Sequence, residues 1–288
     1  MILIADSGST KCDWTIIQAC GEVKSTFKTM GLNPYFHDED DIESALRGVE
    51  GQSSMFSDIT HLFFYGAGSS SAKLCAKMKR GLQRVFYQAE IVVDHDLVGA
   101  AYSTYDGRPG ITSILGTGSN SCFFDGENLR EEVPALAYIL GDEASGSYFG
   151  KILLQEYFYN QLPNDIRLAF EAEYQIDHDT IVDRVYNQAN ANVYLASFMP
   201  FIAKFKDHPH VIDWVVDGMR RFIHIHVKSF PESKTAPIHF VGSIAHYFSH
   251  CLEIVMADEG LKLGKVLKAP IDGLVDYHVK FLIPELQD

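Results

Sequence analysis

Two short loops that combine glycine with hydroxyl side chains, each placed directly after an apolar stretch, constrain this chain more than any other feature. The first loop, residues 6–11, is Asp-Ser-Gly-Ser-Thr-Lys and follows the apolar residues 1–5. The second, residues 116–120, is Gly-Thr-Gly-Ser-Asn and follows residues 111–115. Glycine allows the backbone to approach a phosphate closely, and neighbouring N–H and hydroxyl groups donate to its oxygens. The first loop alone fits a plain β-hairpin turn better than a phosphate site, but two such loops suggest a pair of elements that clamp one phosphate-bearing ligand.

The spacing of apolar residues predicts an α/β protein. Strands are expected at residues 1–5, 13–17, 61–65, 91–93, 111–115, 238–241 and 266–267. Helices are expected at residues 71–86, 97–105 and 145–159, through most of 163–230, and from residue 271 onward. Because each half begins with a strand and a glycine-hydroxyl turn, we expect a coarse duplication in which each half encloses a parallel or mixed sheet.

A cluster of turn formers at residues 106–110 lies between two periodic segments and predicts the domain junction. We therefore expect an N-terminal domain at residues 1–106 and a C-terminal domain at residues 107–288, with a helical insert at about 160–233. The terminal helix can pack back on the N-terminal domain. A chain of 288 residues that is 47% hydrophobic can fill two such cores.

The net charge of −14 opposes binding to nucleic acid or to an anionic membrane, because both require clustered Lys and Arg. A polyphosphate ligand would therefore need local donors and a divalent cation. The five cysteines are scattered, without a close pair at zinc-ligand spacing, and are expected to be reduced and structural. The first apolar run is too short for a signal peptide and no segment could span a bilayer, so we expect a cytoplasmic protein.

Four motifs in this order resemble N-acetylglucosamine kinases, which belong with the benzoyl-CoA-reductase-activase type ATPases in the actin, sugar-kinase and heat-shock-chaperone superfamily. The motifs are the two loops, residues 141–146 (Gly-Asp-Glu-Ala-Ser-Gly) and residues 241–243 (Val-Gly-Ser), and the resemblance extends over essentially the whole chain. The resemblance implies a two-domain, actin-like (ribonuclease H-like) α/β ATPase fold with duplicated mixed sheets, flanking helices and an interdomain nucleotide cleft. The standard P-loop and the Gly-x-Gly-x-x-Gly fingerprint are both absent.

The same resemblance implies an ATP-dependent sugar kinase that transfers the γ-phosphate of Mg-ATP to N-acetylglucosamine or a related amino sugar. ATP and Mg²⁺ would be its cofactors and a small-molecule sugar its partner, with a homodimer as an option. Two alternatives stay open: an iron–sulfur ATPase that activates a partner reductase, for which no suitable paired cysteine motif is visible, and a non-enzymatic sugar or nucleotide sensor.

A candidate general base lies where a strand ends and a helix begins, the usual place for ligand groups in an open α/β sheet. Asp94 and Asp96 flank His95 there, and from the residues alone either carboxylate could be the base. The resemblance favours Asp96, which would orient the sugar hydroxyl and take its proton. We assign Asp94 to capping of the following helix.

The resemblance also distributes the remaining roles. Asp6 would hold Mg²⁺ through water, since the ion keeps part of its hydration shell. The phosphates of ATP would meet Gly8, Ser9, Thr10, Lys11, Gly116, Thr117 and Gly118, and the adenosine would meet Gly242 and Ser243.

The sugar would contact Asn33, Asp96, Ser119, Asn120 and Asp142. Asn33 precedes a proline, so a plain turn is the alternative for that residue. Glu143 would support Asp142 or simply begin the next helix. His224 and His226 are two positions apart and would face different directions on a helix, so a shared metal is disfavoured.

Overall fold

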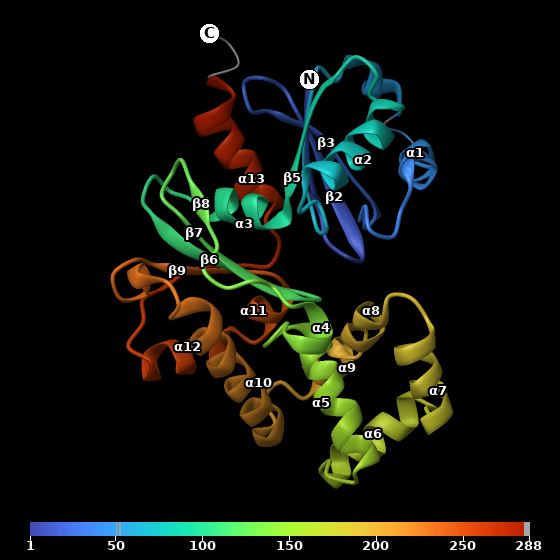
Figure 1. Ribbon diagram of the computed structural model, residues 1–288, viewed down its shortest axis with the longest axis vertical. Helices are drawn as coiled ribbons and strands as arrows, with labels where there is room; N and C mark the ends of the chain where they lie inside the picture. Colours follow the sequence, from blue (N-terminus) through green and yellow to red (C-terminus); the bar gives the residue numbers. More distant parts are fainter. Residues whose placement is uncertain (50, 52, 285–288) are drawn as a thin grey trace. The chain divides into compact units, whose positions relative to one another are not determined.

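The computed structural model describes residues 1–49, 51 and 53–284, which form two compact units (Figure 1). The first unit comprises Met1–Arg108 and the returning segment Ala269–Asp288. The second unit comprises Pro109–Lys268. Among the described residues, no helix combines the length and the apolar character needed to cross a membrane.

The first unit is built on a five-stranded mixed sheet with the order β3-β2-β1-β4-β5. Its strands are β1 (Ile2–Ser7), β2 (Lys11–Ile17), β3 (Val23–Met30), β4 (His61–Gly66) and β5 (Glu90–His95). Its helical segments are α1 (Glu39–Arg47), η1 (Ser53–Asp58), α2 (Ala72–Gln83), α3 (Asp96–Thr104), α13 (Ile271–Tyr277) and η5 (His278–Leu282). Strand β1 runs antiparallel to β2 and parallel to β4, and β4 runs parallel to β5.

Alternation along β1 explains why helices cover both faces of this sheet. Leu3 and Ala5 point to the core that α1 and α2 complete, whereas Ile2 and Ile4 point to the core that includes Leu274 of α13. Helix α13, drawn in red, packs against α3 on that second face (Figure 1). Residues at the end of β1 on the Ile2–Ile4 face therefore point toward the side of the sheet that carries α3.

The second unit is built on a sheet with the order β10-β9-β6-β7-β8. Its strands are β6 (Gly110–Leu115), β7 (Ser119–Phe124), β8 (Leu129–Arg130), β9 (Ile238–Val241) and β10 (Leu263–Leu267). Its helical segments are α4 (Ala137–Leu140), α5 (Gly146–Phe158), α6 (Asn164–Glu173), α7 (His178–Val182), η2 (Asp183–Asn187), α8 (Ala191–Ala196), α9 (Met199–Lys204), α10 (Pro209–Phe222), η3 (Ile223–Val227), η4 (Pro231–Lys234), α11 (Ser243–Tyr247) and α12 (Ser249–Asp258). Strand β6 pairs antiparallel with β7 and parallel with β9.

The seven predicted strands are all present, but β3 and α1 escaped prediction for identifiable reasons. In β3 only Phe27 is buried, so the strand lacks the apolar alternation that identifies a half-buried strand. Helix α1 is short and begins with three acidic residues, and it is held by a capping box in which Asp38 accepts from the backbone of Asp40 and Asp41. Both elements depend on neighbours more than on their own apolar pattern.

Candidate functional site

The first glycine-hydroxyl loop is the turn of the β1–β2 hairpin. The Gly8 N–H donates to the Lys11 carbonyl oxygen at 3.0 Å and closes the turn. Behind it, the Ser7 hydroxyl accepts from the Leu32 N–H at 2.8 Å, which ties the loop to the segment after β3. A Cβ on Gly31 would lie 2.3 Å from the Gly8 carbonyl oxygen, so only glycine permits this close approach. The backbone of the loop is therefore supported from behind.

Asp6, near the end of β1, is the most perturbed carboxylate of this loop. Burial raises its pKa to about 7, and the negative charges of Asp96 and Asp13 act in the same direction, while Lys11 opposes them. A carboxylate that is desolvated and surrounded by like charges gains most from a cation. Hard oxygen ligands suit Mg²⁺, so the donor at Asp6 fits the ion that the sequence implied.

Only a few protein ligands are available for such an ion. Among the described residues, no group of three or more His, Cys, Asp or Glu side chains is arranged to hold a metal. Mg²⁺ commonly keeps several waters and takes one or two carboxylates together with substrate phosphates. Coordination through water at Asp6 is compatible with this sparse set.

The structure corrects the assignment of Asp94 as a helix cap. The residue that precedes α3 is His95, whose side chain makes no capping hydrogen bond, and Asp94 still belongs to β5. The Asp94 carboxylate instead accepts from the His95 N–H at 2.8 Å. The prediction failed because the strand continues to His95 and α3 begins one residue earlier than the apolar pattern indicated.

Asp96 is the first residue of α3, where the helix dipole favours a negative charge. His95 Nε2 lies 3.3 Å from the Asp96 carboxylate. The charge of Asp96 also reaches Asp6, since it contributes to the raised pKa of that residue. The first unit thus brings together the two carboxylates to which the sequence assigned the metal and the base.

Lys11 is occupied by a neighbour on its own strand. Its Nζ lies 2.6 Å from one Asp13 oxygen, and Lys28 Nζ lies 3.2 Å from the other. Burial acts to raise the pKa of Asp13, but the hydrogen bonds from Lys11 and Lys28 outweigh it and lower that pKa. Thr10 is exposed at the tip of the turn. Sequence reasoning had not singled out Asp13, which stands inside a strand without a motif around it.

Asn33 forms a turn, which is the alternative to a sugar contact that the sequence left open for this residue. Its Oδ1 accepts from the Tyr35 N–H at 2.9 Å, and its backbone oxygen accepts from Phe36 and His37. The side chain packs on the loop after β4, because a Cβ on Gly68 would lie 2.3 Å from Asn33 Oδ1. A sugar contact by Asn33 stays a prediction.

The second glycine-hydroxyl loop joins β6 to β7 and is held by the start of α5. The Gly146 N–H donates to the Gly116 carbonyl at 2.8 Å, and the Ser147 N–H donates to the Thr117 carbonyl at 3.1 Å. In a trans peptide the N–H points opposite to the C=O. The N–H groups of Thr117 and Gly118 therefore point away from α5, as donors for an anion would.

Gly242 brings the end of β9 against this loop. Its φ is +125°, and a Cβ there would lie 2.3 Å from the Leu115 carbonyl oxygen. Ser243, the next residue, begins α11. Because β6 and β9 are parallel neighbours, their carboxyl ends meet at one edge of the sheet. The second unit thus joins the two segments to which the sequence assigned phosphate and adenosine.

Asp142 lies directly against the same loop. Its carboxylate accepts from the Ser119 N–H at 3.2 Å, and a Cβ on Gly118 would lie 2.9 Å from its Oδ2. Burial raises the pKa of Asp142 above its ordinary value. The buried Ser119 hydroxyl has no hydrogen-bond partner among the described residues. An unpaired buried hydroxyl beside a carboxylate is costly unless a ligand completes it.

Asn120 points to the neighbouring strand end. Its Nδ2 donates to Glu131 at 3.1 Å, and its Oδ1 accepts from the Ser121 N–H at 2.8 Å. Asn120 and Asp142 therefore flank Ser119 on the second unit.

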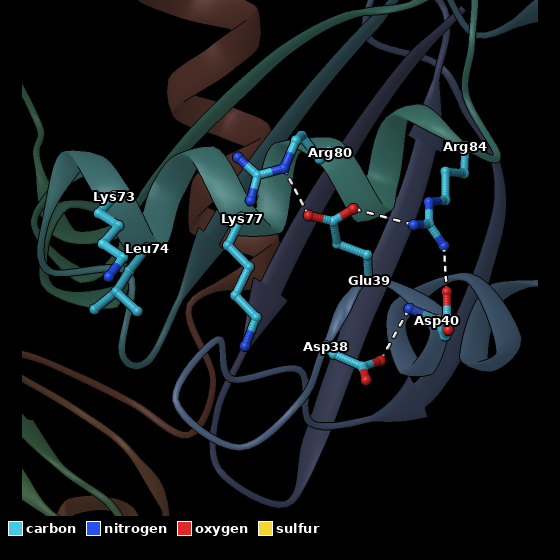
Figure 2. Close-up of a pocket in the computed structure, with 8 residues that line it drawn as sticks. All are labelled: Asp38, Glu39, Asp40, Lys73, Leu74, Lys77, Arg80 and Arg84. Carbon is cyan, nitrogen blue, oxygen red and sulfur yellow. Dashed lines mark hydrogen bonds and ion pairs between the residues drawn. The ribbon is translucent and has the colours of Figure 1, made fainter.

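A cavity of about 320 Å³ lies between α1 and α2 of the first unit. Figure 2 shows Glu39 between Arg80 and Arg84, with the nearest ion-pair distances at 2.6 and 3.1 Å. Lys77 donates to the Pro34 carbonyl at 2.7 Å. Because Arg80 and Arg84 of α2 pair with Glu39 and Asp40 of α1, these charges join the two helices, and we do not assign the catalytic site to this cavity.

The chain is 37% identical to a solved structure from Porphyromonas gingivalis whose name is "Putative N-acetylglucosamine Kinase". The match covers 98% of this chain and 99% of that one, with a TM-score of 0.91. A Chromobacterium violaceum structure of the same name is 15% identical over 96% of this chain and 98% of its own, with a TM-score of 0.62. A ROK family glucokinase from Streptomyces griseus, solved with glucose and AMPPNP, is 17% identical over 96% and 97%, with a TM-score of 0.58.

The last two matches show the fold alone. The prediction of an actin-like α/β fold with duplicated mixed sheets is therefore confirmed. No family model matches the chain, and no curated protein sequence was found to match it.

Proposed function

Because the chain belongs to the same family as the Porphyromonas gingivalis protein, we propose that it is an ATP-dependent kinase whose acceptor is N-acetylglucosamine or a related amino sugar. The proposal includes membership of the activase-type ATPase family, which the four sequence motifs resemble, but not the iron–sulfur activase activity. The observation that supports it best is the strand order of the first unit, in which Asp6 of β1 and Asp94 of β5 lie on either side of Tyr65, so that Asp96 at the start of α3 is near enough for its charge to help raise the pKa of Asp6. Phosphoryl transfer needs a metal-holding group and a group that accepts the hydroxyl proton.

The first unit supplies these two groups. Asp96 orients the acceptor hydroxyl and takes its proton late in the transfer, with His95 at 3.3 Å as its neighbour. Asp6 would hold Mg²⁺ through water, and the ion would supply neutralisation of the β- and γ-phosphate charge. Gly8, Ser9, Thr10 and Lys11 contact the phosphates, and for this role Lys11 exchanges Asp13 for a phosphate oxygen.

The second unit supplies donors for the nucleotide. The N–H groups of Thr117 and Gly118 point away from α5, and Gly116 gives the backbone its close approach. Gly242 and Ser243 contact the adenosine. All of these segments lie at the carboxyl edge of the sheet, where open α/β sheets bind ligands.

The sugar hydroxyls contact Asn33 and Asp96 from the first unit and Ser119, Asn120 and Asp142 from the second. Ser119 gains from this contact most clearly, because its buried hydroxyl otherwise stays unpaired. A site that hydrogen-bonds an acetamido group can reject an analogue lacking it by up to about 10⁴-fold.

A panel of monosaccharides with Mg-ATP tests the proposal. We expect acceptor-dependent ADP release, strongest for N-acetylglucosamine or a close amino-sugar relative. If no monosaccharide raises ADP release above the basal rate, the kinase proposal is wrong.

The iron–sulfur activase alternative has a distinct outcome. An activase would purify anaerobically as a brown protein with stoichiometric iron and would hydrolyse ATP without sugar. Among the described residues, which include all five cysteines, none forms a disulfide, and Cys12, Cys122 and Cys251 are buried. We expect a colourless protein, and an iron assay with an absorption spectrum decides between the two.

A further inference from the structure

The turn that carries Asp142 holds an unusual backbone conformation. We call residues 137–144 the acceptor turn. Three of its non-glycine residues have positive φ: Ala137 at 55°, Asp142 at 55° and Ala144 at 59°. A positive φ is uncommon in residues other than glycine, and it persists only where the surrounding structure imposes the conformation. Specific contacts must therefore hold this turn in place.

Three contacts hold the acceptor turn, and each comes from a different element of the second unit. Lys151 of α5 donates to the Tyr138 carbonyl at 2.6 Å. The Ser119 N–H of β7 donates to Asp142 at 3.2 Å. The third contact joins Glu143 to His226, with Nε2 and Oε2 3.2 Å apart. Glu143 lies between the two left-handed residues Asp142 and Ala144, so its side chain fixes the turn where the conformation is most constrained.

The Glu143–His226 pair is buried. Glu143 is 6% exposed and His226 is 4% exposed. Arg221 Nε lies 3.6 Å from the other Glu143 oxygen. A buried carboxylate is costly unless it is paired and hydrogen-bonded, so any movement of Glu143 away from these partners is penalised. The penalty keeps the neighbouring Asp142 in its conformation.

His226 is itself held at two points. Its ring stacks on Phe222 with a centroid distance of 4.8 Å, and its carbonyl accepts from the Ser121 hydroxyl at 3.2 Å. Ser121 follows Asn120 on β7. The segment η3, which carries His226, is a π-helical continuation of α10. His226 thus connects the acceptor turn to the strand that carries Asn120.

The neighbouring His224 supplies a matched comparison within the same segment. His224 Nε2 lies 2.8 Å from Glu259, but the His224 side chain is half exposed. The sequence expectation that the two histidines face different directions is confirmed, since one binds the buried Glu143 and the other the outer Glu259. Both pairs have the same chemistry, and only the first is joined to the acceptor turn.

We propose that Glu143 is a positioning residue: by binding His226 it holds Asp142 against Gly118 and Ser119 and thereby sets the affinity for the acceptor. This inference rests on the proposed sugar kinase function. The role needs a hydrogen-bond acceptor of the right length at position 143, and it does not need a negative charge at the reacting atoms.

The test compares Glu143→Met, which keeps the volume and removes the acceptor, with Glu143→Gln, which keeps an acceptor oxygen. We expect Glu143→Met to raise the acceptor KM at least 10-fold, with the ATP KM within 2-fold and kcat within 3-fold of wild type. With Glu143→Gln the acceptor KM should stay within about 3-fold of the wild-type value. Glu259→Met, the control at the outer pair, should leave all three constants unchanged. His226→Phe, which keeps the ring stack on Phe222, should show the same rise in the acceptor KM as Glu143→Met. If Glu143→Met does not fold, His226→Phe is used in its place.

Three kinetic outcomes overturn the inference: an unchanged acceptor KM in Glu143→Met and His226→Phe, a parallel rise of both KM values, or a loss confined to kcat. If the wild-type protein responds to no sugar, the proposed function fails, and crystal structures of Glu143→Met and His226→Phe then decide the positioning role. Loss of the positive φ at Asp142 or of its bond to the Ser119 N–H supports that role. Retention of both in the two variants overturns it.

Discussion

Asp6 and Asp13 lie directly opposite each other on the antiparallel strands β1 and β2. Opposed residues of such a pair project to the same face of the sheet, where like charges repel. Two basic side chains, Lys11 and Lys28, pair with Asp13, and Asp6 is left with the higher pKa. The two lysines therefore keep Asp13 ionised, whereas ionised Asp6 needs a cation to offset its charge.

The raised pKa of Asp6 makes stability depend on pH. The folded protein has a pKa of about 7 at this carboxyl and the unfolded chain about 3.9, so between these values the folded state holds a proton that the unfolded state has released. Stability from this group is therefore highest near pH 4 and falls as pH rises to about 7. Asp6→Asn removes that fall, so the Tm of the variant relative to wild type should increase between pH 4 and pH 7. Thermal unfolding in EDTA across this range checks it, and parallel Tm profiles would contradict it.

Magnesium should reverse the effect in the wild-type protein. Added Mg²⁺ stabilises ionised Asp6, so at pH 8 with an ATP analogue it should raise the wild-type Tm. At pH 6–7, where Asp6 still carries a proton in part of the molecules, Mg²⁺ binding should release protons. The same addition should have little effect on Asp6→Asn. The measurement is a thermal shift with and without Mg²⁺, and an equal shift in both proteins would remove Asp6 from the metal site.

Asp96→Asn should abolish most turnover while leaving ligand binding intact. A positioned general base contributes about 10²–10⁴-fold, and kcat should fall by that factor because an amide cannot take the hydroxyl proton. Calorimetric titration with sugar and ATP analogue should give near wild-type affinities. Asp94→Asn is the companion variant, since Asp94 belongs to β5 and binds the His95 N–H. Turnover of Asp96→Asn within a few-fold of wild type would transfer the role to Asp94 or end base catalysis.

Gly242→Ala should destabilise the second unit and weaken nucleotide binding. The added Cβ meets the Leu115 carbonyl oxygen at 2.3 Å, and the φ of +125° is strained for alanine. We expect a loss of about 2 kcal/mol or more in the free energy of unfolding and a raised ATP KM. Gly260→Ala is the matched control, because Gly260 also has a positive φ but open space around its Cβ position, and it should cost only about 1 kcal/mol. Equal losses in denaturant titrations of the two variants would argue against close packing at Gly242.

Asn120→Ala should raise the acceptor KM far more than the ATP KM. Asn120 lies one residue after Ser119, whose N–H binds Asp142, and under the proposed function its amide contacts the acceptor. Asn128→Ala, in the exposed turn after β7, serves as the control and should leave both constants unchanged. An Asn120→Ala effect limited to ATP would place this residue at the nucleotide instead.

The local pattern of the chain was sufficient to place the loops and most elements. Continuous apolar runs marked β1 and β4, because a strand buried on both faces requires them, and shorter apolar stretches marked β5, β6 and β9. Glycine at residues 8, 116 and 242 marked the turns, and at Gly242 an added Cβ would lie only 2.3 Å from the Leu115 carbonyl oxygen. Strand β3 stayed hidden because a single buried phenylalanine gives no period.

The sequence therefore determined the kinds of groups and their local positions: two phosphate-type loops, a carboxylate at the strand-to-helix junction and a carboxylate before α5. Tertiary structure alone decided which groups interact and how they titrate. Asp6 and Asp94 fall on one row of the first sheet through Tyr65, and this order brings α3 and its Asp96 to Asp6. Glu143 finds His226 only because α10 and η3 fold back on α5. Pairings between distant residues and the desolvation that shifts a pKa depend on strand order and packing, and neither is encoded in the spacing of residues along a local segment.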